Sequence, residues 1–216
     1  MNVIFTCGGT GGHINPAIAL ANTLRERDPN CKILFVGCVV EMEEQLVPKA
    51  GYEIKCLPGS RFFRQLNFKN IKRNVQGVGR ILAALNGARK IVKDFKPDVI
   101  VGTGGYASYP MIRAAAKMGI PTAVHESNAI PGLTTQMLEP YADLIMVGFE
   151  ECRKNYRQPH KVMVTGTPVR GDFFTLTRKE AKAQLGMDDG RPLIVSFWGS
   201  LGASTMNDRM LEFFQR

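Results

Sequence analysis

Two glycine-rich strings have the composition of loops that approach a charged ligand. The first reads Gly-Gly-Thr-Gly-Gly-His over residues 8–13, and the second reads Gly-Thr-Gly-Gly-Tyr over residues 102–106. Glycines let backbone amides come close to a ligand, and a helix that starts after the loop adds unpaired N–H groups and a positive dipole end for phosphate. The first string is neither GxGxxG, because Ile14 fills the third glycine position, nor a Walker A loop, because no Gly-Lys-Ser/Thr follows.

A third string adds titratable side chains. His125, Glu126, Ser127 and Asn128 place an imidazole, a carboxylate and an amide within four residues, and Ile-Pro-Gly follows at 130–132. Each string taken alone also fits a plain turn with polar caps, with His13 as a helix-start residue. Three such loops on one edge of a sheet favour a binding or catalytic site.

The elements that must position these loops alternate between short apolar strands and helices. This alternation predicts an α/β fold with a parallel sheet covered on both faces, which binds ligands at the carboxyl ends of its strands. The predicted strands are 2–7, 32–37, 53–57, 98–102, 122–125, 144–148 and 161–165. The predicted helices are 15–27, 41–50, 77–95, 109–118 and 132–141.

The sequence after residue 164 predicts a hinge and the start of a second α/β domain. We expect an N-terminal domain over 1–164, and a hinge with an incomplete C-terminal domain over 165–216. The second part has a helix at 178–185, a strand at 193–198 and a helix from residue 204 onward. One strand and two helices cannot bury a core alone, so we expect the sequence to be truncated at its C-terminus.

The positive charge of the chain is concentrated in one segment. The net charge is +9, and residues 61–96 hold ten Lys or Arg and one acid, which equals the whole excess. Apolar residues among these cations suit contact with anionic lipid headgroups, whereas a solvated basic face whose apolar residues pack on the sheet is the alternative. Nucleic-acid binding is not expected, because no nucleic-acid motif accompanies the charge. The membrane candidates are Phe62, Phe63, Arg64, Lys69, Lys72 and Arg73.

The cysteine spacing and the hydropathy of the chain indicate the cellular compartment. The five cysteines are widely spaced and form no CxxC pair, which suits a reducing cytoplasm and argues against a disulfide framework or a zinc site. We expect no secretory leader, because no cationic segment precedes the apolar run at 2–7 and glycines end it. We expect no membrane-spanning helix, because no apolar run reaches about 18 residues.

Five strings in this order resemble the MurG family of glycosyltransferases: GGTGGHINP, GTGGYASYP, HESNAIPGLT, GTPVR and WGSLGAS. The resemblance runs from the first residue to the last. It implies a GT-B fold, in which a Rossmann-like N-terminal domain binds the lipid-linked acceptor and a second such domain binds most of the UDP-sugar. The implied enzyme is a hexosyltransferase on the cytoplasmic face of the cell membrane, peripheral to it. It acts in peptidoglycan synthesis and so in cell wall biogenesis, cell shape and cell division.

The resemblance implies one inverting displacement. The C4 hydroxyl of N-acetylmuramic acid in undecaprenyl-pyrophosphoryl-N-acetylmuramyl-pentapeptide (lipid I) attacks the anomeric carbon of UDP-N-acetylglucosamine, which gives lipid II and UDP. A base must take the hydroxyl proton, and the leaving diphosphate must be stabilised. No Asp-x-Asp pair is present to chelate a metal, so we expect helix N-termini and Arg170 to stabilise the diphosphate, with no metal and no cofactor required.

The same resemblance assigns roles to individual residues. His13 is the candidate general base, with Glu126 as the alternative base and as an acceptor contact. The hinge has Thr167 where Asn is common, and Leu201 stands where Gln is common. The implied substrate-binding residues are Thr10, Gly11 and Gly12 at the acceptor–donor junction, Gly104, Gly105 and Tyr106 for the acceptor, Asn128 for the donor sugar, and Arg170 and Ser200 for UDP.

Two other functions remain open from the sequence. A UDP-N-acetylglucosamine 2-epimerase has a related fold and uses the same nucleotide sugar, but it has no need of a basic aromatic segment. A non-catalytic fragment or subunit that binds only the acceptor is the second alternative. We expect little or no transferase activity from these 216 residues alone, because orientation of the sugar nucleotide carries much of the rate.

Overall fold

The computed structural model describes residues 1–39, 41–58, 68–196, 198 and 203–215, with backbone only for 68–78 and 172. The chain divides into two compact units, Met1–Pro168 and Val169–Arg216.

The first unit is built on a seven-stranded sheet in which every neighbouring pair of strands is parallel. The parallel pairing confirms the α/β prediction, and the strand order is β3-β2-β1-β4-β5-β6-β7. The strands are β1 (Asn2–Thr6), β2 (Lys32–Cys38), β3 (Glu53–Leu57), β4 (Val99–Gly102), β5 (Thr122–Glu126), β6 (Leu144–Val147) and β7 (Val162–Val164).

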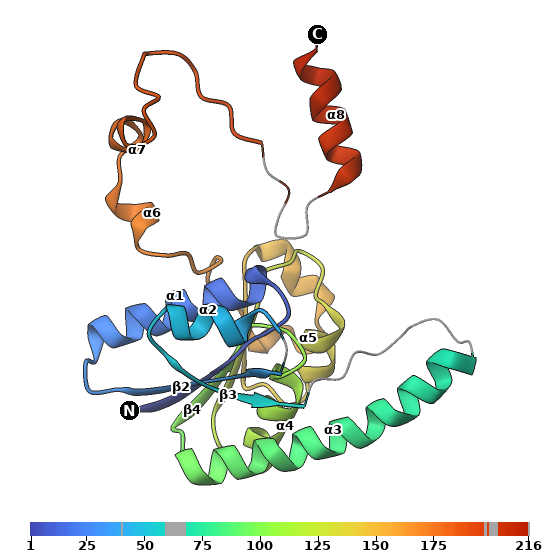
Figure 1. Cartoon of the computed structure of the whole chain (residues 1–216). Helices are drawn as coiled ribbons and strands as arrows, with labels where there is room; N and C mark the ends of the chain where they lie inside the picture. Colours follow the sequence, from blue (N-terminus) through green and yellow to red (C-terminus); the bar gives the residue numbers. More distant parts are fainter. Residues whose placement is uncertain (40, 59–67, 197, 199–202, 216) are drawn as a thin grey trace. The chain divides into compact units, whose positions relative to one another are not determined.

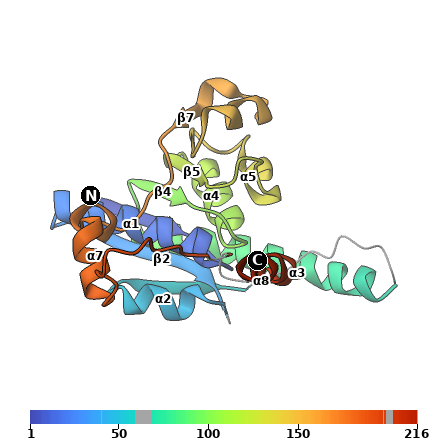
Figure 2. The same ribbon diagram turned by 90° about the horizontal axis from the view of Figure 1, so that it is seen from above.

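Helices cover both faces of this sheet (Figure 1). Helices α1 (Gly11–Arg27) and α2 (Glu43–Lys49) contribute to one buried apolar cluster, in which Phe35 packs between Phe5 and Tyr52 at ring-centroid distances of 5.5 and 5.1 Å. Helices α3 (Phe68–Phe95), α4 (Ser108–Lys117) and α5 (Leu133–Leu138) belong to the other face. Figure 2 shows α5 and β7 at the opposite end of the sheet from α2.

The topology creates a switch point at β1. This strand pairs with β2 on one side and with β4 on the other. The chain runs outward from β1 to β3 at one edge, and from β4 to β7 at the other. The loops that follow β1 and β4 therefore diverge at the position where doubly wound sheets bind ligands.

Two helices begin several residues earlier than the sequence indicates. Helix α1 starts at Gly11 rather than Asn15, because the carbonyl of Thr10 already accepts hydrogen bonds from the amides of His13 and Ile14 at 3.0 and 3.1 Å. His13 consequently lies in the first helical turn. Helix α3 starts at Phe68 rather than at residue 77.

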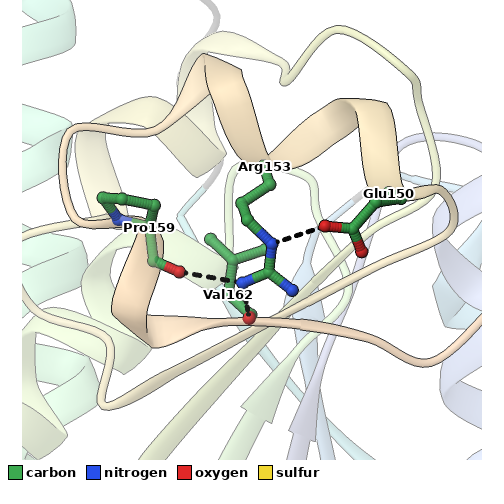
Figure 3. A network of polar contacts seen from close by, with 4 residues as sticks. All are labelled: Glu150, Arg153, Pro159 and Val162. Carbon is green, nitrogen blue, oxygen red and sulfur yellow. Dashed lines mark hydrogen bonds and ion pairs between the residues drawn. The ribbon is translucent and has the colours of Figure 1, made fainter.

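Arg153 holds the connection between β6 and β7 in place (Figure 3). The connection contains η1 (Glu150–Asn155) and η2 (Pro159–Lys161). The Arg153 Nη1 group donates to the carbonyls of Pro159 and Val162 at 3.0 and 2.6 Å, and Nε donates to Glu150 at 2.8 Å. The hydrogen bond from Arg153 holds the pKa of the Glu150 carboxyl below its ordinary value.

The second unit contains α6 (Asp172–Thr175), α7 (Arg178–Gln184) and α8 (Ser204–Phe214). Thr177 and Glu180 form a capping box at the start of α7. The strand predicted at 193–198 is wrong for the residues described there, since 193–196 and 198 are irregular. Ile194 and Val195 are 67% and 68% exposed. A strand needs a neighbour for its backbone groups, and the described part of this unit offers none.

No helix in the described part of the chain is both long enough and apolar enough to cross a membrane.

Candidate functional site

The two glycine-rich loops are in direct backbone contact at the switch point. A Cβ placed on Gly105 would stand 2.7 Å from the nitrogen of Gly8 and closer still to its carbonyl oxygen. Gly105 also has φ of +87°, a conformation that side chains disfavour. Only glycine at position 105 lets the loop after β4 approach the loop after β1 this closely.

His13 lies beside this contact, with its ring held by the first loop. The Nδ1 atom is 2.9 Å from the carbonyl oxygen of Gly8. A carbonyl only accepts, so Nδ1 carries the proton, and in the neutral ring Nε2 holds the lone pair. A Cβ on Gly104 would stand 2.9 Å from this Nε2, so glycine at 104 leaves space at the basic edge of the ring. Thr103 donates its hydroxyl to the His13 carbonyl at 2.6 Å.

The start of α1 offers backbone donors next to the imidazole. Thr10 is extended and makes no side-chain cap. The N–H groups of Gly11 and Gly12 lie in the first turn, where a helix has no internal acceptors, and no acceptor outside the helix is recorded for them among the described residues. These donors and the helix dipole suit an anion such as a diphosphate.

The sequence analysis missed Glu43, a buried acid behind the first loop. Its side chain on α2 is 0% exposed, and its two oxygens accept the N–H groups of Gly9 and Cys38 at 3.0 and 2.9 Å. Gly8 and Gly37 make room for it, since a Cβ on either would collide with the Glu43 side chain. An acid at a helix start normally indicates an exposed residue that complements the dipole, so the sequence holds no clear signal for this contact.

Both carboxylate oxygens of Glu126, at the end of β5, accept hydrogen bonds from the loop that follows and from the start of α5. One oxygen accepts the backbone and side-chain N–H groups of Asn128 at 2.9 and 2.7 Å. The other accepts the Gly132 amide at 2.9 Å and the Thr135 hydroxyl at 2.7 Å. Glu126 is 4% exposed. The carboxylate therefore braces the third loop and orients the Asn128 amide, which lies exposed at the sheet edge.

His125 is buried within the sheet and faces the end of the first unit. Its Nε2 atom donates to the carbonyl of Gly166 at 3.0 Å, and the hydroxyl of Ser127 lies 3.5 Å from Nδ1. Burial lowers the pKa of this imidazole. His125 thus ties β5 to the chain just after β7.

The structure places the remaining predicted residues unevenly. Tyr106 is 41% exposed and follows the two positive-φ glycines of the second loop. Arg170 belongs to the second unit, and Ser200 lies outside the described residues. Of the proposed membrane residues, Phe62, Phe63 and Arg64 also lie outside the described residues, whereas Lys69, Lys72 and Arg73 belong to α3. In the described part of the chain, no cluster of three or more His, Cys, Asp or Glu side chains is arranged to hold a metal ion.

The segment that contains the three loops matches a known protein family. The family described as "Glycosyltransferase family 28 N-terminal domain" matches residues 3–147, which contain all seven strands except the last and all three loops. The chain belongs to glycosyltransferase family 28.

Two relatives of this family 28 chain have the same name. A protein of Alkaliphilus oremlandii is 41% identical over 216 residues, and one of Acetivibrio thermocellus is 39% identical over the same length. Both are named UDP-N-acetylglucosamine--N-acetylmuramyl-(pentapeptide) pyrophosphoryl-undecaprenol N-acetylglucosamine transferase. The matches cover 100% of this chain and 58% of each relative. The MurG resemblance is thereby confirmed, and the chain spans somewhat more than half the length of these relatives.

Solved structures agree with the family 28 assignment. The crystal structure of Acinetobacter baumannii MurG matches with a TM-score of 0.69 at 27% identity, over 97% of this chain and 55% of that one. A UDP-GlcNAc 2-epimerase from Neisseria meningitidis, bound to UDP-GlcNAc, matches with a TM-score of 0.54 at 14% identity, over 77% of this chain and 46% of that one. At that identity the second match shows a shared fold alone.

Proposed function

We propose that this chain is the acceptor-binding half of an inverting N-acetylglucosaminyltransferase. The proposed donor is UDP-N-acetylglucosamine, and the proposed acceptor is undecaprenyl-pyrophosphoryl-N-acetylmuramyl-pentapeptide. The names of the relatives support both substrates. The observation that carries the proposal is the His13 ring, whose Nδ1–H donates to Gly8 and whose Nε2 edge lies beside Gly104 at the junction of the two glycine loops.

The chemistry follows from this arrangement. Nε2 of His13 takes the proton from the acceptor C4 hydroxyl as that oxygen attacks the anomeric carbon. The amides of Gly11 and Gly12 and the dipole of α1 bind diphosphate oxygens next to the same ring. Arg170 and Ser200, by the family resemblance, contact the UDP portion, and Asn128 contacts the donor sugar.

The contacts of the two candidate bases favour His13 over Glu126. A general base needs an accessible lone pair within hydrogen-bond reach of the proton that it takes. His13 is half-buried with Nδ1 engaged, which directs its lone pair away from the loop that holds it. Glu126 instead accepts four hydrogen bonds from its own loop. We therefore propose His13 as the base and Glu126 as the brace that positions Asn128.

The test is a transfer assay with UDP-N-acetylglucosamine and the lipid acceptor, on the chain extended to the length of its relatives. His13→Ala should lower kcat about a hundred- to ten-thousand-fold and leave the KM for UDP-N-acetylglucosamine nearly unchanged. His160→Ala, at an exposed histidine, is the control and should keep wild-type turnover. Near-normal kcat for folded His13→Ala, together with a large loss for Glu126→Ala, would transfer the role to the carboxylate.

We further propose that the segment 61–73 attaches the protein to the anionic cytoplasmic face of the cell membrane. The support is compositional: two adjacent phenylalanines lie among cations, and the proposed acceptor carries a polyprenyl chain. Such an attachment is reversible and depends on salt.

A further inference from the structure

One peptide group lies between two titratable side chains. The carbonyl of Gly8 accepts the Nδ1–H of His13 at 2.9 Å, and the N–H of Gly9, in the same peptide plane, donates to Oε2 of Glu43 at 3.0 Å. A carboxylate and an imidazole that are 30 positions apart in the chain are thus joined by two hydrogen bonds through one planar amide.

We infer that Glu43 is a positioning residue for His13 and acts through the Gly8–Gly9 peptide. This inference rests on the proposed role of His13 as the base. In serine proteases a buried aspartate holds the catalytic histidine in one tautomer and stabilises the imidazolium that forms. Here the Glu43 carboxylate polarises the Gly8–Gly9 peptide, and the Gly8 carbonyl holds His13 in one tautomer and stabilises the imidazolium that forms. Hydrogen bonds in such a chain strengthen one another in a low-dielectric site.

The packing around Glu43 fits this role. The side chain is 0% exposed, and a buried carboxylate must be compensated by donors. Both oxygens accept a backbone N–H, which is the pattern of an ionised carboxylate. A Cβ on Gly8 would lie 3.0 Å from Glu43 Cδ, and one on Gly37 would lie 3.0 Å from Oε1. Two strand-end glycines therefore leave the space that the carboxylate occupies.

The titratable groups near Glu43 are thiols and two more acids, Glu41 and Glu44. Burial raises the pKa of the Cys38 thiol to about 12, and the charges of Glu43 and Glu41 add to this rise. Burial and Glu43 also raise the pKa of the thiols of Cys7 and Cys56. These thiols stay neutral near pH 7.

The described residues that contact His13 on its own loop and on the loop after β4 include Gly8, Thr10, Thr103 and Gly104, and none of them has a titratable side chain.

The competing explanation is a purely structural tie between α2 and the first loop. Such a tie would affect the stability of the fold, but it would not determine which nitrogen of His13 carries the proton. The tautomer and the pH dependence of the rate therefore separate the two explanations.

The first experiment uses the chain as it stands. Nitrogen-15 NMR of the imidazoles reports which ring nitrogen is protonated, and His13→Gln assigns the signal among the three histidines. In the wild type we expect the Nδ1–H tautomer above neutral pH. Glu43→Gln should lower the Nδ1–H fraction, because its amide is neutral and has one acceptor oxygen for two facing N–H groups. Glu44→Gln, at an exposed acid on the same helix, should leave the fraction unchanged.

The second experiment measures kinetics in the chain extended to the length of its relatives. Glu43→Gln should lower kcat roughly ten- to a hundredfold, as the loss of an orienting partner does elsewhere, with the acceptor KM within about twofold. The acid limb of the rate–pH profile should move to lower pH, because a lost negative charge makes the imidazolium less stable. Glu43→Asp keeps the charge and should keep the acid limb in place.

Three results would overturn the inference. They are a wild-type His13 ring protonated at Nε2, an unchanged Nδ1–H fraction in Glu43→Gln, and an unchanged acid limb in that variant. If Glu43→Gln does not fold, the wild-type tautomer and the Glu43→Asp profile decide. Retained turnover in His13→Ala would instead remove the proposed base while the tautomer result still reports on the hydrogen-bond chain, so the two failures are distinguishable.

Discussion

Gly105 packs against the backbone of Gly8, with a hypothetical Cβ on Gly105 only 2.7 Å from the Gly8 nitrogen. The contact joins the loops after β1 and β4, which are neighbours in the sheet although 97 positions separate the two glycines. It also holds Gly8 where its carbonyl accepts the hydrogen bond from Nδ1 of His13.

Gly105→Ala should separate the two loops. The added methyl collides with rigid backbone and occupies a φ of +87°, so we expect a loss of folding stability and a large loss of transfer activity in the extended protein. Gly119→Ala is the matched control, because Gly119 has φ of +72° with open space around its Cβ position. It should cost about 1 kcal/mol by strain alone. Chemical unfolding of both variants checks this, and equal losses would show that the loop contact is unimportant.

Glu126→Ala should destabilise the first unit by about 1–3 kcal/mol. The substitution leaves the buried hydroxyl of Thr135 without its acceptor, and it also removes the hydrogen bonds that the exposed Asn128 and Gly132 donate. Glu151→Ala, at an exposed acid, should be nearly neutral. Urea unfolding followed by circular dichroism measures both. A stable Glu126→Ala protein would contradict the bracing role.

Stability should fall as the pH drops below about 6.5, the ordinary pKa of histidine. Burial lowers the pKa of His125 in the folded state, so the unfolded state binds the proton first as the pH falls. Proton binding therefore stabilises the unfolded state relative to the folded one. This destabilisation by His125 is absent above its ordinary pKa and grows as the pH falls toward its pKa in the folded state. His125→Gln should reduce the loss of Tm between pH 7 and pH 5, whereas His160→Gln, at an exposed site, should not. Identical pH slopes in both variants would assign the effect to other groups.

The segment 61–73 should bind vesicles that contain anionic lipid and release them at high salt. Phe62→Ser/Phe63→Ser should weaken cosedimentation with vesicles strongly, because phenyl rings that enter the lipid and cations that attract its headgroups act together. Phe173→Ser/Phe174→Ser removes a second adjacent pair, 70% and 80% exposed in the second unit, and should leave binding unchanged. Equal binding to neutral and anionic vesicles, or by both double variants, would remove the membrane role.

The sequence by itself determined the parallel α/β fold and the position of the three loops at the carboxyl edge of the sheet. Buried parallel strands are nearly continuous apolar runs, and local patterns of this kind do not need the rest of the chain to be recognised. The five motif strings likewise identified the family, because each string is a contiguous segment whose residue types can be compared directly.

Tertiary structure alone decided how the site is held together. Glu43 meets Gly9 because α2 packs against the loop after β1, and no pattern within either segment specifies that packing. The Gly8 carbonyl accepts a hydrogen bond from Nδ1 of His13, and Glu126 accepts hydrogen bonds from Asn128 and Thr135, which supports the proposed bracing role. The strand predicted at 193–198 is absent from the residues described there, 193–196 and 198, for a related reason. Its apolar pattern is local, but a strand exists only where another backbone pairs with it, and long-range pairing is what a single sequence leaves unspecified.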